Sequence, residues 1–67
     1  MKSIIKVNQI NKQKDVANIQ NAIAGIEGII ACEISVEKKE IHVIYNDNFV
    51  NLDKIVEGIE NIGYIVM

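Results

Sequence analysis

The sequence contains no arginine, no proline and no tryptophan, and its aromatic fraction is only 4%. Most nucleic-acid-binding proteins use forked guanidinium contacts to phosphate and aromatic stacking platforms, and both are missing here. Cys32 is the only cysteine, so no internal disulfide can form. No apolar run is long enough to span a bilayer, and the first residues lack the apolar block of a signal peptide. We therefore expect a cytoplasmic protein that binds no nucleic acid and does not insert into a membrane.

The net charge of -2 conceals an uneven distribution along the chain. Four lysines (Lys2, Lys6, Lys12 and Lys14) give the first fourteen residues a charge of +4 with no acid, so the remainder carries -6. The hydrophobic fraction of 49% and the charged fraction of 24% are typical of a folded globular protein. A length of 67 residues allows one domain, 1–67, close to the lower size limit for a single core.

The segment 28–45 predicts a β-hairpin. Its apolar side chains recur at every second position in two runs: Cys32, Ile34 and Val36, then Ile41, Val43 and Tyr45. Folding about Lys38 and Lys39 would place both runs on one face, with the pairs Val36–Ile41, Ile34–Val43 and Cys32–Tyr45. We expect a type I turn there, because lysine does not favour the positive φ of a tight type I′ turn.

Amphipathic segments on either side can cover that face. Apolar residues at helical spacing predict one helix over about 12–24, with Asn11 as N-cap and Gly25 or Gly28 as its stop. A second helix is predicted after Asn51 and ends at Gly63, and its apolar side is formed by Leu52, Ile55, Val56, Ile59 and Ile62. Alternation predicts short strands at 5–7 and 64–66.

The resulting order, βαββαβ, predicts an α+β fold of the ferredoxin-like type, with a four-stranded antiparallel sheet and both helices on one face. Ile10, in the polar loop before the first helix, is expected to reach the core. On the opposite sheet face, Ile4, Ile44 and Ile65 would either align as a small apolar contact patch or lie scattered, as single exposed apolar residues commonly do.

The sequence resembles the heavy-metal-associated domain family, which includes small copper chaperones and the N-terminal domains of metal-transporting P-type ATPases. The resemblance spans essentially the whole chain. It rests on ordered segments of matching spacing: Val16-x-x-Ile19-x-x-Ala22-Ile23, Gly28-Ile29, Glu33-Ile34-Ser35-Val36, Ile41-x-Val43-x-Tyr45 and Asn51-Leu52-x-x-Ile55-x-x-x-Ile59-x-x-Ile62-Gly63-Tyr64-x-Val66.

The family's metal motif is Gly-Met-Thr/Asp-Cys-x-x-Cys, and it aligns with residues 9–15 of this chain. Ile10 takes the place of the methionine, and Lys12 and Asp15 take the places of the two cysteines. Soft Cu(I) is held by thiolates, so we expect no Cu(I), Zn(II) or Cd(II) at this loop and no cofactor. Either the Lys12 ammonium occupies the space of the metal and pairs with Asp15, or both side chains project into water.

No other residues form a catalytic constellation, so we do not expect an enzyme. Strand alternation places Cys32 on the core face and His42 on the opposite face, which excludes a Cys-His nucleophile pair. Cys32 is expected to act as a small buried hydrophobe.

The resemblance implies that partners dock around the former metal loop, with Tyr64 beside it. The expected partner contacts are Ile10, Lys12, Lys14, Asp15 and Tyr64, and the lysines favour an acidic protein surface such as a metal-transporter or chaperone domain. The chain would then be an interaction or regulatory domain related to metal transport, either a monomer or a weak homodimer. One alternative is a heavy-metal binding or transport protein that uses Cys32 or His42 as ligands. Another is a small-molecule sensor, for which the sequence shows no pocket.

Overall fold

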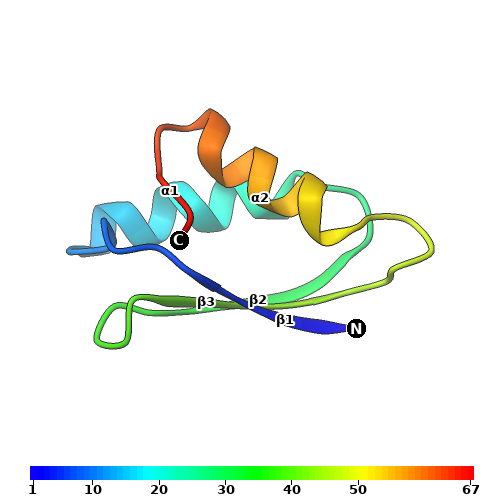
Figure 1. The fold of residues 1–67 in the computed structure, drawn as a ribbon, viewed down its shortest axis with the longest axis horizontal. Coiled ribbons are helices and arrows are strands. Elements are labelled where there is room, and N and C mark those ends of the chain that lie inside the picture. Colours follow the sequence, from blue (N-terminus) through cyan, green and yellow to red (C-terminus); the bar gives the residue numbers. More distant parts are fainter.

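The computed structural model describes all residues 1–67. Five elements follow one another along the chain: β1 (Lys2–Lys6), α1 (Gln13–Ala24), β2 (Ile29–Ser35), β3 (Glu40–Tyr45) and α2 (Leu52–Asn61). The strands form one antiparallel sheet in the order β1-β3-β2, and both helices cover the same face of it (Figure 1). The predicted α+β architecture with two helices on one face of an antiparallel sheet is therefore confirmed.

The core lies between the sheet and the two helices. Twelve apolar side chains are buried there: Ile5, Val7, Ile10, Val16, Ile19, Ile23, Ile41, Val43, Tyr45, Val50, Ile55 and Ile59. Ile10 is completely buried although it belongs to a loop, as predicted. Leu52 and Ile62 are 38% and 43% exposed, so their predicted place on the buried side of α2 is wrong. Leu52 is the first residue of α2 and Ile62 is its C-cap, so both lie at the ends of the helix. Neither helix combines the length and the apolar character that a membrane-crossing helix requires.

The start of α1 differs from the prediction by one residue. The N-cap is Lys12 in an extended conformation, not Asn11. A lysine side chain has no acceptor, so the carboxylate of Asp15 supplies the capping interaction from inside the helix instead. The cap of α2 is confirmed, since Asn51 Oδ1 accepts a hydrogen bond from the Lys54 amide at 2.9 Å. Gly63, with φ +99°, confirms the left-handed stop after this helix.

The β2–β3 hairpin has a different register from the predicted one. Cys32 lies opposite Val43, and Ile34 lies opposite Ile41. Val36 belongs to the turn, which spans 36–39 and contains a left-handed Lys39 at φ +58°. The shift is two residues, so every apolar side chain keeps its predicted face. The turn is held from outside the hairpin, because the Lys39 ammonium donates to Ile10 O and to Asn11 Oδ1.

The fourth predicted strand, 64–66, is not formed. The segment after α2 turns back toward β1 (Figure 1), but only one backbone hydrogen bond joins them, from Met67 N to Lys6 O at 2.9 Å. The amide of Ile65 donates to Gln9 Oε1 at 2.7 Å instead of to a neighbouring strand. Side chains of the β1–α1 loop therefore anchor this segment where a strand ladder was expected.

The sheet face away from the helices is mixed in character. Ile4 lies opposite His42 and Ile44 lies opposite Lys2, so the two isoleucines are diagonal rather than direct neighbours. Both are exposed, as is Ile65 in the segment after α2. A continuous apolar stripe across three strands is not formed, because the third strand is absent and polar residues alternate with the isoleucines.

Gly28 allows a close approach between the start of β2 and the loop before α2. Its φ is +97°, and an added Cβ would lie 2.9 Å from Val50 Cγ1 and 3.0 Å from Phe49 Cβ.

We expect Gly28→Ala to lower the free energy of unfolding by about 2–4 kcal/mol, measured by urea denaturation. Gly63→Ala is the matched control, because Gly63 has nearly the same φ and no atom within 4 Å of its added Cβ. It should cost only about 1 kcal/mol, and equal losses in the two variants would contradict the steric argument.

Candidate functional site

The loop between β1 and α1, residues 7–12, is fastened on two sides. Ile10 anchors it in the core, and Lys39 from the hairpin turn reaches across to it. The Lys39 ammonium donates to Ile10 O and, at 2.7 Å, to Asn11 Oδ1, while Val7 N donates to Lys39 O at 3.0 Å. A buried apolar side chain and a charged donor thus fix the backbone of a segment that has no regular structure.

The carboxylate of Asp15 is the centre of this site. Its Oδ2 accepts hydrogen bonds from Asn11 N at 3.0 Å and from Lys12 N at 3.2 Å. Its Oδ1 accepts one from the Tyr64 hydroxyl at 2.6 Å. Hydrogen bonds from Tyr64 and from the Asn11 amide favour the charged form, so the pKa of Asp15 lies below its usual value. Both oxygens are therefore engaged by this chain itself.

Tyr64 connects the segment after α2 to the loop. The hydroxyl donates to Asp15, and this bond to an anion raises the pKa of Tyr64 above its ordinary value. The resemblance placed Tyr64 beside the loop, and the structure shows its hydroxyl on Asp15 in the first turn of α1. The ring is half-buried and packs against the core, so one side chain both fills space and donates a hydrogen bond.

Lys12 and Lys14 project into solvent. The only salt bridges within 4.0 Å join Glu40 to Lys6 and to His42, so Lys12 and Asp15 do not form the ammonium–carboxylate pair that one hypothesis required. Lys12 contacts Asp15 through its backbone amide alone. Lys38 in the hairpin turn is also exposed, and none of these three lysines forms a salt bridge.

Cys32 and His42 lie on opposite faces of the sheet, as predicted. Cys32 is half-buried against the core, and burial raises the pKa of its thiol. His42 Nε2 lies 3.1 Å from Glu40 Oε1 on the open face. The hydrogen bond with His42 and the charge of Lys6 hold the pKa of Glu40 below its usual value.

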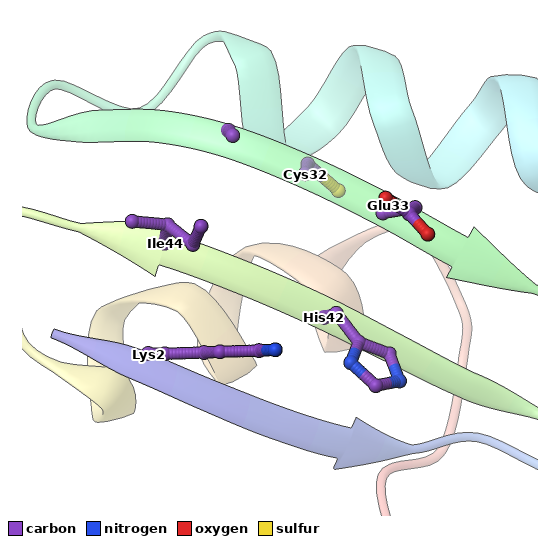
Figure 2. A pocket seen from close by; sticks show the side chains of 6 residues that line it. Lys2, Cys32, Glu33, His42 and Ile44 are labelled. Atoms are coloured by element: carbon purple, nitrogen blue, oxygen red, sulfur yellow. The ribbon is translucent and has the colours of Figure 1, made fainter.

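The open face has a shallow depression of about 140 Å³ (Figure 2). Lys2, His42, Ile44 and Glu33 surround it, each from a strand of the sheet. A second, more open hollow of about 270 Å³ lies at the loop before α2, between Phe49 and Lys54. No cluster of three or more His, Cys, Asp or Glu side chains arranged for a metal ion occurs in the chain.

Comparison with known proteins agrees with the fold. The sequence profile described as "Heavy-metal-associated domain" matches residues 4–64. The chain belongs to this family. The copper chaperone CopZ of Staphylococcus epidermidis RP62A is 30% identical over 63 residues, which cover 94% of this chain and 93% of the relative.

Solved structures give the same fold. A CopZ metallochaperone superposes with a TM-score of 0.96 at 22% identity, with full coverage of both chains. The yeast copper transporter domain Ccc2a superposes with a TM-score of 0.89 at 28% identity, covering 97% of this chain and 89% of that one. A CopZ metallochaperone and a copper transporter domain therefore share the ferredoxin-like fold of this heavy-metal-associated domain.

Two residues of the site were not identified from the sequence. Lys39 reaches Ile10 across 29 positions, and Gln9 binds the amide of Ile65 across 56 positions. No local pattern marks either contact, because lysine in a turn and glutamine in a loop are ordinary surface residues. The positive φ of Lys39 is what directs its side chain to the loop, and the residue type alone does not reveal that φ.

The pKa of Asp15 tests the hydrogen-bond network. Because this pKa is lower in the folded protein, the network stabilises the fold at neutral pH, and that stabilisation is lost as the pH falls through the range in which Asp15 is protonated. We expect Tyr64→Phe to raise the Asp15 pKa part of the way to its usual value in an NMR titration, since two amide donors remain. Tyr45→Phe removes a hydroxyl that contacts Ser3 and should leave Asp15 unchanged. If the Asp15 pKa is identical in the wild type and in Tyr64→Phe, the tyrosine is not a cause of the lowered pKa.

Proposed function

We propose that this chain is a non-enzymatic heavy-metal-associated domain that has lost its Cys-x-x-Cys site and serves as a protein-interaction or regulatory domain of cytoplasmic metal transport. The observation that carries the proposal is the Asp15 carboxylate. It stands where the family resemblance implies the second cysteine, and both of its oxygens accept hydrogen bonds from this chain.

The residues at the loop do not suit Cu(I). Lys12, at the first implied cysteine position, has an ammonium with no lone pair, and a carboxylate is a poor ligand for a soft cation. A cation about 4 Å from that ammonium would be repelled by roughly 4 kcal/mol per unit charge at an effective dielectric near 20. Both oxygens of Asp15 already accept hydrogen bonds from this chain, so an ion bound there would compete with them.

The exposed lysines favour an acidic partner. Lys12 and Lys14 are exposed where the loop enters α1, Ile10 buries the loop in the core, and Tyr64 donates to Asp15. Complementary charge speeds the encounter of two such surfaces and sets their register. The relatives are a copper chaperone and a copper transporter domain, so a metal-transport protein with an acidic docking surface is the partner class that fits.

The second candidate is a copper-binding protein that uses other ligands, favoured by the relationship to CopZ. It requires Cys32 or His42 to bind the ion. Cys32 is packed against the core with a raised thiol pKa, and His42 lies on the other face of the sheet. The two cannot meet on one ion within a single chain, so this candidate requires a metal-bridged dimer.

Restoring the two cysteines tests the loss of the site. We expect the double variant Lys12→Cys/Asp15→Cys to form a one-to-one Cu(I) complex in native mass spectrometry and to compete with a chromophoric Cu(I) chelator. The wild type should do neither, because its loop offers no thiolate.

The variant Lys12→Ser/Asp15→Ser is the control for loss of the native side chains and should remain metal-free. A wild-type complex tighter than about micromolar that disappears in Asp15→Asn would contradict the proposal. A copper-bridged dimer that disappears in Cys32→Ser would instead support the second candidate.

Charge reversal tests the docking surface. The probe is the copper-binding domain of a copper-transporting ATPase from the same genome, titrated into isotope-labelled chain and followed by NMR. We expect Lys12→Glu/Lys14→Glu to weaken binding roughly tenfold or more in low salt, with a smaller difference at high ionic strength.

The matched control is Lys2→Glu/Lys54→Glu, which changes the net charge equally at exposed positions away from the loop. It should leave the affinity nearly unchanged. Shift changes that spare residues 9–16, or equal losses in both double variants, would refute docking through this loop.

A further inference from the structure

The two edge strands of the sheet, β1 and β2, differ in how well they are protected from pairing with another chain. On β1, the segment after α2 donates from Met67 N to Lys6 O, and two lysines, Lys2 and Lys6, belong to the strand. Lysines and covering segments are common devices that prevent an edge from pairing with another chain. On β2 the outer side pairs with no strand, since β3 is its only neighbour.

β2 has fewer features that protect an edge: one irregularity near its start and one charged side chain. Its seven residues, Ile29–Ser35, include no proline and no lysine, and Glu33 is the only charged side chain. Ile30 is 68% exposed and Ala31 is exposed as well. The single irregularity, between Ile29 and Ala31, lies at one end of the strand. The rest of the edge is free to accept a further strand.

The helix above this edge is uncharged. α1 packs against β2, and from Val16 to Ala24 it contains no ionisable residue. Its exposed positions in this stretch are small or carry amides: Ala17, Asn18, Gln20, Asn21 and Ala24. In a chain with 24% charged residues, an uncharged helix beside an unprotected strand is a surface that an identical copy can approach without like-charge repulsion.

We propose that β2 pairs antiparallel with β2 of a second copy of this chain, about a two-fold axis at Cys32. This arrangement joins the two sheets into one of six strands with all helices on the same side. It leaves the loop around Lys12 and Lys14 free, so the proposal stands or falls independently of the proposed function.

The register follows from overlap and charge. Pairing about Cys32 overlaps all of Ile29–Ser35, with regular pairing over Ala31–Glu33 and the irregular end at Ile30 outside it, and it places Glu33 opposite Ala31 of the other copy. Pairing about Glu33 would set two carboxylates opposite each other, which is unfavourable. Pairing about Ile34 would keep only 33–35 within both strands. A register shifted by one residue would put the core face of one copy on the open face of the other.

Ile30 belongs to the irregular end of β2, so this register assigns it no direct pair across the axis. The strand is short, so the interface is smaller than that of a stable dimer and the association is weak. We expect the dimer to have a dissociation constant of roughly tens to hundreds of micromolar.

The test is a charge pair at Ala31, measured by sedimentation equilibrium from 10 µM to 1 mM with a reductant and a chelator present. In Ala31→Lys, the new lysine of each copy would lie opposite Glu33 of the other copy, so the two-fold axis creates two ion pairs. The dimer should tighten roughly two- to thirtyfold. Ala31→Glu should weaken it by a similar factor. Lysine and glutamate have comparable strand propensities, so each variant controls for the other.

The difference between the two variants should shrink in 1 M salt. Cross-copy NOEs between Ala31 and Glu33 in a mixed labelled sample would fix the register directly. A wild type that stays monomeric at 1 mM would overturn the proposal. So would a dimer whose affinity changes in the same direction in both variants, because it would use another surface.

Discussion

The Asp15 carboxylate is the interaction on which the loop and the end of the chain both depend. It accepts hydrogen bonds from two amides just before α1, those of Asn11 and Lys12, and from the hydroxyl of Tyr64, which lies 49 positions further along the chain than Asp15. A charged acceptor forms stronger hydrogen bonds than a neutral one, and an acid in the first turn of a helix is favoured by the helix dipole. One side chain thereby caps α1, closes the loop and positions the segment after α2.

This arrangement determines the charge that the loop presents to a partner. Because amide dipoles and Tyr64 satisfy Asp15, the Lys12 ammonium is not needed as its counter-ion and remains exposed. Lys39 is used differently, since it donates to the loop backbone and adds positive charge close to it. The same network that fixes the backbone therefore leaves Lys12 and Lys14 exposed, as the proposed docking surface requires.

Burial patterns in the sequence sufficed for the layers and faces but not for the details that fix the site. The alternation of apolar residues determines the face of each strand residue, but a shift of the hairpin register by two residues leaves every face unchanged. Alternation alone therefore does not distinguish the predicted pair Cys32–Tyr45 from the observed pair Cys32–Val43. The helix start was misplaced because a cap from Asp15 at the third helical position replaced one from Asn11. The contacts of Lys39 and Gln9 join distant segments and depend on the finished fold.

The two candidate surfaces follow from one property of the fold. The β1–α1 loop is held by contacts that do not involve β2: Lys39 donates to its backbone, the loop's own Ile10 is buried in the core, and its Gln9 accepts from the Ile65 amide. The loop thus does not rely on the outer side of β2, and the strand edge can be occupied without disturbing the hydrogen bonds of Asp15. A dimer formed through β2 would present two basic loops on one assembly. Two linked sites raise the effective concentration of the second contact, so even a weak dimer would strengthen binding to a partner with repeated domains.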